Sequence, residues 1–393
     1  MSSICVSRKI IGTKKNLIID DDGFFWSEFV PNNSYYFSGE VKYLNDFCFD
    51  SLLLLKDLNI NFSVPEKYIT ASKEVNNEFP LWKYILPSDT FRTSLEKLIN
   101  DLKGNLDNLP KDYFRGTWAS GNAILRQLQP AYVDITIFDQ YKASQYNLGS
   151  LNSFTHDKDG LCQNTIYDRF GTVTGRLSIK SGPNIHNLKK DLRNILTSRY
   201  KNGRIINIDF SSLEPSLIMR EFNEDFSGDV YSSLSEKLSI SRKVIKAAII
   251  IELYGGSKKT LIEKFSLSKE DVDQIYNHIY EKFRLRDLKK LLISNIKNGF
   301  MFNKFGRPIF LEENPDRIIL NYYAQSTGAD ISLLGYKTIL EELNNTLIVP
   351  LFVLHDGIFL DVPYDCIERV LNISSVKVDK YKMPFLVSSR INE

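Results

Sequence analysis

Two apolar segments of this chain each run into an aspartate. Residues 205–210 read IINIDF and include Asp209, and residues 351–354 read LFVL and lead through a histidine to Asp356. Short runs of β-branched and aromatic residues predict buried strands. A carboxylate at the end of a buried strand is costly unless a cation meets it. The sequence therefore predicts a sheet in which two distant strands carry acids at their ends.

Each acid also has a local explanation. Ser211 and Glu214 have the spacing of a capping box, which would explain Glu214 as part of a helix start but leaves Asp209 unexplained. The Asp356-Gly357 pair between two apolar runs is a strong hairpin signal, so a tight turn alone would explain Asp356. Two aspartates at one place repel each other, and a divalent metal is the usual remedy. The turn and the metal pair both stay open at this point.

Positive charge is concentrated in two stretches. Residues 176–204 contain eight basic side chains and one acid, as do residues 282–307, so each stretch carries +7. The rest of a chain with net charge +2 then carries about −12. Such a distribution is typical of proteins that bind a polyanion. Solvated helix faces and loops are the alternative for either stretch. Together with the paired aspartates, the basic stretches favour a phosphate substrate and two-metal phosphoryl transfer.

Residues 241–256, SRKVIKAAIIIELYGG, predict a helix with one functional face. Four side chains follow at four-residue steps and so share that face: Arg242, Lys246, Ile250 and Tyr254. Two glycines then end the helix. Two cations at one end and an aromatic ring at the other suit phosphates and a stacked base. An ordinary amphipathic helix with solvated Arg and Lys has the same spacing.

The whole pattern predicts an α+β protein with a mixed or antiparallel sheet at its centre. The expected order is strands and loops to residue 88, helices over 89–148, irregular chain over 151–204, helices over 229–298 and 317–344, and strands over 346–362. With 393 residues, 43% hydrophobic and 25% charged, the chain suits two or three soluble domains. Four separated cysteines, no signal peptide and no membrane span make the cytosol the expected location.

Five motifs in order along residues 167–362 resemble the family-A DNA polymerases, the bacterial DNA polymerase I type. DRFGTVTGRLSIKSGPNIHN is similar to the TGRLS and PNLQN region, NIDFSSLEPSL to motif A, and SRKVIKAAIIIELYGG to motif B. FGRPIFLEENPDRIILNYYAQSTGADI resembles the segment with FGRRRYLP and RxxxNxPxQGTAAD, and VLHDGIFLDV resembles motif C. The resemblance implies a right-hand polymerase of palm, fingers and thumb, with an antiparallel palm sheet and mostly helical fingers.

The resemblance also implies roles at a catalytic centre. Asp209, Asp356 and the backbone carbonyl of Phe210 would bind two Mg²⁺ ions, for which Mn²⁺ can substitute. Lys246 would be catalytic as well, since it could protonate the pyrophosphate. The nucleotide would be bound by six side chains: Arg242, Lys246, Ile250, Tyr254, Glu214 and Tyr231. Of these, Glu214 would block the ribose 2′-hydroxyl, and Tyr231 stands where the family commonly has a phosphate-binding histidine.

Primer-template DNA would be contacted by another set of residues: Arg176, Arg317, Asn321, Gln325 and His355. Arg176 and Gln325 would touch minor-groove acceptors that all base pairs share. The chain departs from the family pattern at a few positions. Gly357 replaces a glutamate usually thought auxiliary, and Ile250 replaces an aromatic residue that helps read the sugar 3′ position. Pro215 and Ser216 replace the usual Leu-Arg pair after Glu214.

The expected division is a small N-terminal region of unknown role in 1–88, a thumb in 89–150, a palm in 151–228 and 301–393, and fingers in 229–300. A proofreading exonuclease needs roughly 150 to 200 residues, so a complete one is not expected in the first 88. The acidic run at residues 20–22 is interpreted as a turn.

The expected function is template-directed extension of a DNA primer with dNTPs, without proofreading. The expected partners are primer-template DNA, dNTPs and replication accessory proteins, with no membrane. A phage or mobile element is the expected source, which would place the protein in the host cytoplasm. Two alternatives remain. One is an RNA polymerase or reverse transcriptase on the same fold, against which Glu214 argues. The other is a catalytically silent DNA-binding replication subunit, against which four intact residues argue: Asp209, Asp356, Arg242 and Lys246.

Overall fold

The chain divides into two compact units. A computed structural model describes residues 3–6, 15–20, 23–31, 34–37, 66–74, 86–90, 93, 111–144, 148–169, 171–296, 300–311 and 315–392. The first unit comprises Met1–Ala119, Ile296–Phe302 and Gly306–Glu312, and the second comprises Ser120–Asn295, Asn303–Phe305 and Glu313–Glu393. Within the described ranges, no helix has both the length and the apolar character that a membrane span requires.

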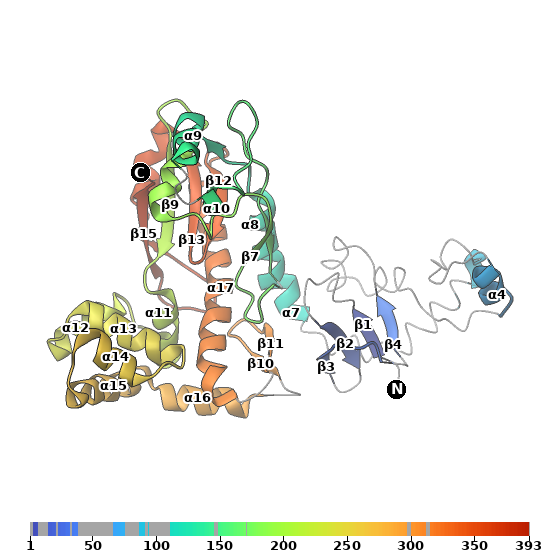
Figure 1. Cartoon of the computed structure of the whole chain (residues 1–393). Coiled ribbons are helices and arrows are strands. Elements are labelled where there is room, and N and C mark those ends of the chain that lie inside the picture. The colour runs from blue at the N-terminus through green and yellow to red at the C-terminus, as the bar shows by residue number, and fades with distance from the viewer. Residues whose placement is uncertain are drawn as a thin grey trace. The chain divides into compact units, whose positions relative to one another are not determined.

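The first unit contains a four-stranded sheet in the order β3-β2-β1-β4 (Figure 1). β4 is parallel to β1 and the other pairs are antiparallel. Asp20 at the end of β2 pairs with Gly23 at the start of β3, and residues 21 and 22 of the acidic run, which was interpreted as a turn, lie outside the described part. The elements of this unit are β1 (Ser3–Val6), β2 (Asn16–Asp20), β3 (Gly23–Ser27), β4 (Ser34–Phe37), α4 (Glu66–Glu74), α7 (Lys111–Tyr113), the π-helical η1 (Phe114–Trp118), β10 (Phe300–Phe302) and β11 (Pro308–Phe310).

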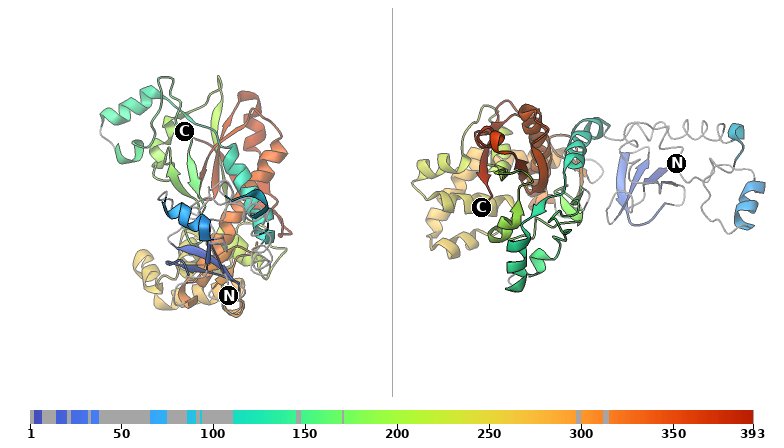
Figure 2. Two further views of the ribbon diagram at one scale, coloured as in Figure 1. Left: turned by 90° about the vertical axis from the view of Figure 1, so that its right-hand side faces the viewer. Right: turned by 90° about the horizontal axis from the view of Figure 1, so that it is seen from above.

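The second unit is built on a five-stranded antiparallel sheet in the order β12-β13-β9-β15-β14. The strands are β9 (Arg204–Phe210), β12 (Val349–Leu354), β13 (Gly357–Val362), β14 (Ser375–Val376) and β15 (Phe385–Ile391). β9 therefore lies between strands from the end of the chain (Figure 1), in a sheet that Figure 2 shows from two further sides. The predicted α+β class, the antiparallel sheet and both apolar strands are confirmed.

Helix α17 (Pro315–Leu343) packs against one face of this sheet. The ring of Phe210 in β9 lies 5.9 Å from that of Tyr336 in the helix. A Cβ added at Gly335 would come within 2.5 Å of Phe210, so a glycine is required for the helix to approach the strand. The long helix predicted over residues 317–344 is confirmed.

The opposite face of the sheet is covered by the segment before β9. Ile205, Phe352 and Phe359 from the sheet share one core with Phe138 and Leu192 from that segment. Burying each such side chain stabilises the fold by about 1.5–3 kcal/mol. As predicted, the segment is largely irregular beyond its first helices. Its elements are α8 (Ala119–Gln127), β5 (Tyr132–Val133), α9 (Ile135–Ala143), α10 (Leu148–Leu151), β6 (Ile166–Asp168), β7 (Ser178–Ser181), the 3₁₀ helix η2 (Lys190–Ile195) and β8 (Leu196–Thr197).

Helices follow β9, and most of them gather at the end of α17 away from the sheet (Figure 1). Several begin with a side-chain cap. Asp229, for example, accepts from the backbone N–H groups of Tyr231 and Ser232 at the start of α12. The helices are α11 (Leu213–Arg220), α12 (Val230–Leu238), α13 (Arg242–Leu253), α14 (Lys258–Phe265), α15 (Lys269–Phe283) and α16 (Leu285–Ser294). The short η3 (Tyr364–Cys366) and α18 (Ile367–Leu371) lie nearer the C-terminus.

A buried ion pair anchors the chain before β9. Asp361 in β13 is 1% exposed and accepts from Nε of Arg199 over 2.9 Å and from its backbone N–H over 3.1 Å. The remaining guanidinium nitrogens of Arg199 donate to Gln129 and Pro130, each over 2.9 Å. Arg199 belongs to the first basic stretch, but its side chain is committed to the fold.

We expect Arg199→Ala to destabilise the protein by about 3 kcal/mol, because it leaves the charge of Asp361 buried without its partner. Urea denaturation measures the loss. Lys201→Ala, an exposed position in the same stretch, should change stability by less than about 0.5 kcal/mol. Equal stability of the two variants would contradict a structural role for Arg199.

Candidate active site

The strand register brings Asp209 and Asp356 together. β9 and β13 pair with Asp209 opposite Gly357, the residue that follows Asp356. The N–H of Phe210 donates to the carbonyl of Asp356 over 2.9 Å. The two acids, which are far apart in sequence, therefore lie at the same end of neighbouring strands in the middle of the sheet.

The hairpin that carries Asp356 is shifted by one residue from the predicted turn. Leu354 pairs with Gly357, so His355 and Asp356 form the turn and Gly357 begins β13. The tight turn left open for Asp356 is therefore present, with His355 rather than Gly357 as its other residue. His355, with φ of 54°, takes the left-handed conformation instead. A Cβ at Gly357 would lie 2.9 Å from Oδ1 of Asp209, so a larger residue there would require the carboxylate to shift.

Tyr167 and His186 hold β12 just before this turn. The Tyr167 hydroxyl donates to the carbonyl of Val353 and accepts from its N–H, each over 2.9 Å. His186 Nε2 lies 3.2 Å from the same carbonyl, and its ring stacks on that of His355 with centroids 5.2 Å apart. These contacts fix the strand end and the turn from which Asp356 projects.

The surroundings of the two carboxylates disfavour their charged forms. Burial, and then the charge of Asp356, raise the pKa of Asp209 to about 7, while Arg390, Arg193 and Lys246 act in the opposite direction. Burial also raises the pKa of Asp356. A divalent cation would offset both the burial and the repulsion. Carboxylate oxygens are ligands that Mg²⁺ prefers, so the donor set fits such an ion.

Phe210 offers a backbone oxygen at the same place. The N–H and C=O of one strand residue point to the same side. Because the N–H of Phe210 bonds to Asp356, its carbonyl faces the same neighbouring strand. Among the described residues, no three or more His, Cys, Asp or Glu side chains form a metal cluster. A cation at this site would thus need further ligands from the backbone, other oxygen groups, water or substrate.

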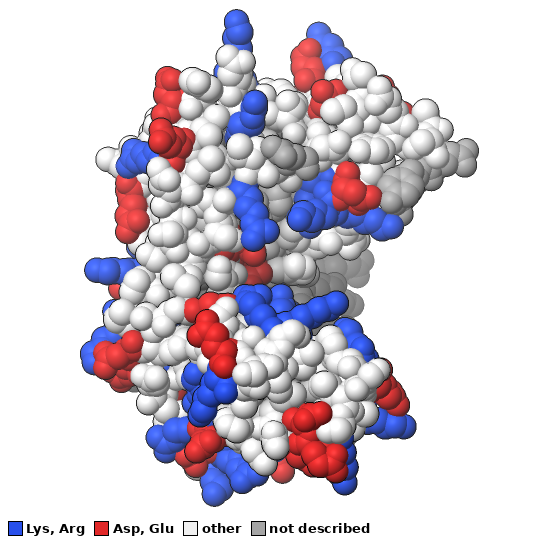
Figure 3. Space-filling view, turned by 90° about the vertical axis from the view of Figure 1, so that its left-hand side faces the viewer, with Lys and Arg blue, Asp and Glu red and all other residues white. Residues whose placement is uncertain are grey.

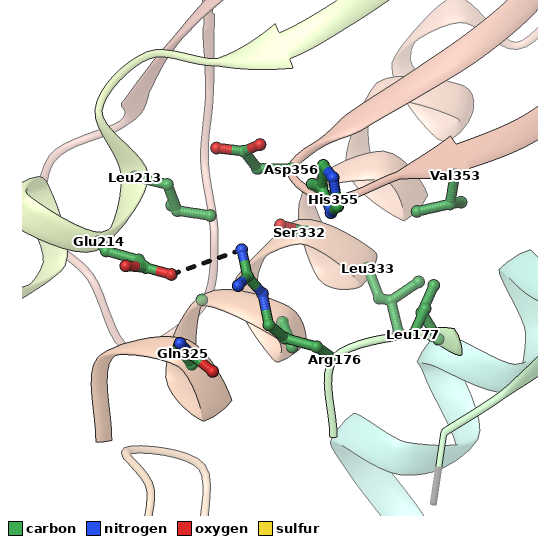
Figure 4. Close-up of a pocket in the computed structure, with 12 residues that line it drawn as sticks. Arg176, Leu177, Leu213, Glu214, Gln325, Ser332, Leu333, Val353, His355 and Asp356 are labelled. Atoms are coloured by element: carbon green, nitrogen blue, oxygen red, sulfur yellow. Dashed lines mark ion pairs between the residues drawn. The ribbon is translucent and has the colours of Figure 1, made fainter. Parts of the chain in front are cut away.

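Glu214 does not form the predicted capping box. The N-cap of α11 is Ser212, not Ser211, and its side chain makes no capping hydrogen bond. Ser212 has φ of 56°, which turns the chain before the helix starts. Glu214 instead accepts from the Tyr254 hydroxyl over 2.9 Å and forms an ion pair with Arg176 at 3.8 Å (Figure 4). Burial raises the pKa of Glu214, against the charge of Arg176 and the hydrogen bond from Tyr254.

One pocket holds several of the predicted site residues (Figure 4). Arg176 extends across it toward Glu214, and Asp356 and His355 lie on the other side of the guanidinium. Gln325 enters from α17 and accepts from the hydroxyl of Thr174 over 3.3 Å. The pocket thus combines residues from four separate segments of the chain.

The other two predicted DNA contacts lie on α17. Oδ1 of Asn321 is buried and has no hydrogen-bond partner within the described part of the chain. Arg317 falls in the first turn of the helix, but its side chain is outside the described residues. The structure therefore places Arg317 by its backbone alone.

The structure sets the four predicted side chains of α13 on its exposed face, with Val244, Ile245, Ala248, Ile249 and Leu253 buried on the other. Arg242 donates from Nε to Asp229 over 2.8 Å, and its guanidinium lies 5.1 Å from the centre of the Tyr231 ring. Lys246 Nζ lies 5.9 Å from the same ring. Tyr231 itself is buried beside both cations. Although burial acts to raise it, hydrogen bonds from Arg242 and Ser232 lower the pKa of Asp229 to about 2.

Three charged residues near the site had no assigned role in the sequence. Asp229 holds Arg242, and Arg193 and Arg390 act on the charge of Asp209. The Asp229 cap was detectable as an N-cap signal before an apolar run. Nothing local marks Arg193 or Arg390, because the sheet register and the fold of the preceding segment bring them to Asp209.

The basic stretches are only partly available to a polyanion. Arg199 is used by Asp361, Arg307 is buried, and Lys304 pairs with Glu221 at 2.9 Å. Lys297 lies outside the described residues. Other Lys and Arg side chains gather on both sides of a hollow in the face of the molecule shown in Figure 3. That hollow separates the level of the sheet from the level of helices α12–α15.

Comparisons with known proteins agree with this geometry. The model for "DNA polymerase family A" matches residues 93–392. A thermostable DNA polymerase I of Thermus thermophilus is 22% identical over 330 residues, which cover 74% of this chain and 39% of that protein. The Thermus aquaticus enzyme is 22% identical over 324 residues, with 72% and 38% covered. The chain thus spans about two fifths of the length of these curated relatives.

A phage protein and a solved structure are also similar. The DNA polymerase of Mycobacterium phage L5 is 28% identical over 144 residues, which cover 36% of this chain and 24% of that protein. The solved polymerase domain of Pol1 from M. smegmatis, in complex with DNA primer-template and dNTP, has a TM-score of 0.50 and 18% identity. The match covers 88% of this chain and 63% of the solved chain, and it shows a likeness of fold.

Proposed function

Since the chain belongs to DNA polymerase family A, we propose that it extends a DNA primer along a template by transferring nucleotides from dNTPs. The observation that carries the proposal is the register that sets Asp209 opposite Gly357 and beside Asp356. Two acids at the end of a central strand pair, with Lys246 close enough to act on both charges, suit nucleotidyl transfer with two metal ions.

The sheet with α17 would be the palm, helices α12–α16 the fingers, and residues 89–150 the thumb. Primer-template DNA and dNTP, the ligands named for the M. smegmatis neighbour, are the proposed ligands here. Arg176 and Gln325 would contact the minor groove at the primer end, Asn321 and Arg317 would contact DNA along α17, and His355 would lie by the primer terminus.

Asp209, Asp356 and the Phe210 carbonyl would hold two Mg²⁺ ions, or Mn²⁺ in their place. When bound, such ions activate the primer hydroxyl and offset charge on the leaving pyrophosphate. Lys246 would donate a proton to the pyrophosphate oxygen that leaves. When the triphosphate binds, Arg242 would leave its ion pair with Asp229 and bind phosphate oxygens instead.

The nucleotide would bind against Tyr231, Tyr254 and Ile250. Tyr231 would support the phosphate-binding cations from beneath, since its ring lies under both Arg242 and Lys246. Tyr254 would close the pocket over the base and, through its hydroxyl, hold Glu214 where a ribose 2′-hydroxyl would lie.

Primer extension with dNTPs or NTPs tests this function directly. We expect extension with dNTPs in Mg²⁺ and very little with NTPs. Preferential use of NTPs would indicate an RNA polymerase, and extension only on an RNA template would indicate a reverse transcriptase. Duplex binding without extension in Mg²⁺ or Mn²⁺ would indicate a silent DNA-binding subunit. Each of these last three results contradicts the proposal.

Glu214→Ala should increase ribonucleotide incorporation relative to deoxyribonucleotide by about 10- to 100-fold. The variant removes the side chain proposed to exclude the 2′-hydroxyl, and a buried polar mismatch of this kind is worth about 1–3 kcal/mol. The ratio of kcat/KM for NTP and dNTP measures the change. Glu221→Ala is the matched control. Glu221 is the C-cap of the helix that carries Glu214, but it pairs with Lys304. An unchanged ratio in Glu214→Ala would show that Glu214 serves only to position Tyr254 and Arg176.

The source and location of the protein are part of the proposal. The match to a phage DNA polymerase supports a phage or mobile element as the source, with the host cytoplasm as the location. The proposed activity extends primers without removing mismatches. Replication accessory proteins would be further partners.

A further inference from the structure

Gly357 leaves a space that two oxygen atoms of β9 border. A Cβ at this position would lie 2.9 Å from Oδ1 of Asp209 and 2.9 Å from Oδ1 of Asn207. The two oxygens therefore lie within twice that distance of each other. Asn207 and Asp209 are two residues apart in one strand, so their side chains are on the same face of the sheet.

None of the described residues donates a hydrogen bond to the side-chain oxygen of Asn207, Oδ1, which is buried. Arg390 lies directly opposite Asn207 in β15, yet it makes no such bond. Leaving a buried acceptor unpaired costs about 1–3 kcal/mol, so an unpaired acceptor in a native site points to a water or an ion.

Other acceptors lie near this oxygen, although Arg390 and Arg193 also act on the charge of the neighbouring Asp209. Asp209 carries the carboxylate that converges on the same space, and Asp356 precedes Gly357 in the hairpin turn. Carboxylate, amide and backbone carbonyl oxygens are the ligand types of a hard divalent cation. An ion shared by these groups would satisfy Asn207 and reduce the repulsion between the acids at once.

We propose that Asn207 is a further oxygen ligand of the divalent cation that Asp209 and Asp356 would bind, in the space that Gly357 leaves open. The inference rests on the proposed function, because it takes the metal pair as given. It adds a residue outside the motif residues assigned from the sequence. It also gives Gly357 a role, since a Cβ there would lie 2.9 Å from both oxygens.

Titration of the full chain with Mn²⁺, followed by the electron paramagnetic resonance signal of the free ion, tests this without substrate. Asn207→Ala should raise the Kd for Mn²⁺ about tenfold, a loss typical of a group that supports a metal. Gly357→Ala should weaken binding too, because its Cβ would crowd both oxygens. Asn207→Asp should bind Mn²⁺ at least as tightly as the wild type, since it keeps an oxygen ligand and adds charge.

Ser389→Ala is the matched control, because Ser389 pairs with Ile208 and so lies on the other face of the sheet. It should leave the Kd unchanged. A wild-type Kd in Asn207→Ala would overturn the inference and leave only a water at this oxygen. Equal weakening in Asn207→Asp and Asn207→Ala would also overturn it, because the amide would then act as a donor to Asp209. If Asp356→Asn binds Mn²⁺ like the wild type, the metal pair of the proposed function fails instead.

Discussion

Asp356→Ala is expected to reduce primer extension by at least about a thousandfold. The variant removes one of the two carboxylates proposed to hold the metal ions, and the charge stabilisation that such ions supply is worth several kcal/mol. About 4 kcal/mol corresponds to a thousandfold in rate. Single-turnover extension of a labelled primer measures the loss, and Asp209→Ala should show the same effect.

Binding and folding should survive both substitutions. Phosphate contacts dominate duplex affinity, and neither aspartate supplies one. Folding raises the pKa of Asp209 to about 7. At pH 8 the carboxylate is ionised, and burying this charge in the folded state lowers the free energy of unfolding. Asp209→Ala in EDTA should therefore melt at no lower temperature than the wild type. Asp365→Ala, an exposed acid in η3, should extend primers normally. Near-normal extension by Asp356→Ala would contradict the assignment of both acids.

Lys246→Ala should reduce kcat by about 10²- to 10³-fold. General acid catalysis by a positioned side chain contributes rate factors of about this size. Lys246 is exposed on α13, near enough to Asp209 and Asp356 for its charge to act on both, and its Nζ lies 5.9 Å from the Tyr231 ring. Pre-steady-state incorporation of one dNTP separates kcat from the nucleotide affinity.

Lys243→Ala is the control for this variant. Lys243 is exposed on the same helix but off the face that carries Lys246. We expect its loss to change kcat by less than about threefold, within the effect of a surface substitution. Equal effects of the two substitutions would mean that α13 contributes only general positive charge. A Lys246→Ala variant with reduced nucleotide affinity but unchanged kcat would assign Lys246 to binding alone.

The strands and helices of the second unit could be predicted because their apolar patterns are periodic and strong. The run that ends at Asp209 and the run before His355 both became central strands. The cost of burying two acids favoured their lying side by side in the folded protein. The strand register confirms this, because it sets Asp209 opposite Gly357, the residue after Asp356. The sequence left a tight turn as an alternative, and in the structure Asp356 belongs both to the turn and to the acid pair.

The errors concern details that depend on neighbouring chain segments. The hairpin turn is formed by His355 and Asp356, one residue earlier than an Asp-Gly pair indicates, and Gly357 pairs with Asp209 in the strand. Glu214 bonds to Tyr254 from α13 and to Arg176, so its capping role gave way to contacts from distant segments. Asn207 carries no local signal, because its unpaired oxygen is visible only once the strands are paired.

Anomalous diffraction from crystals grown with Mn²⁺ would test the shared metal site most directly. The account predicts an anomalous peak with both Asp209 and Asp356 within coordination distance of it, about 2.0–2.6 Å for oxygen ligands of such ions. A peak bound by only one of these carboxylates, or no peak near either when Mn²⁺ supports extension in solution, would contradict it.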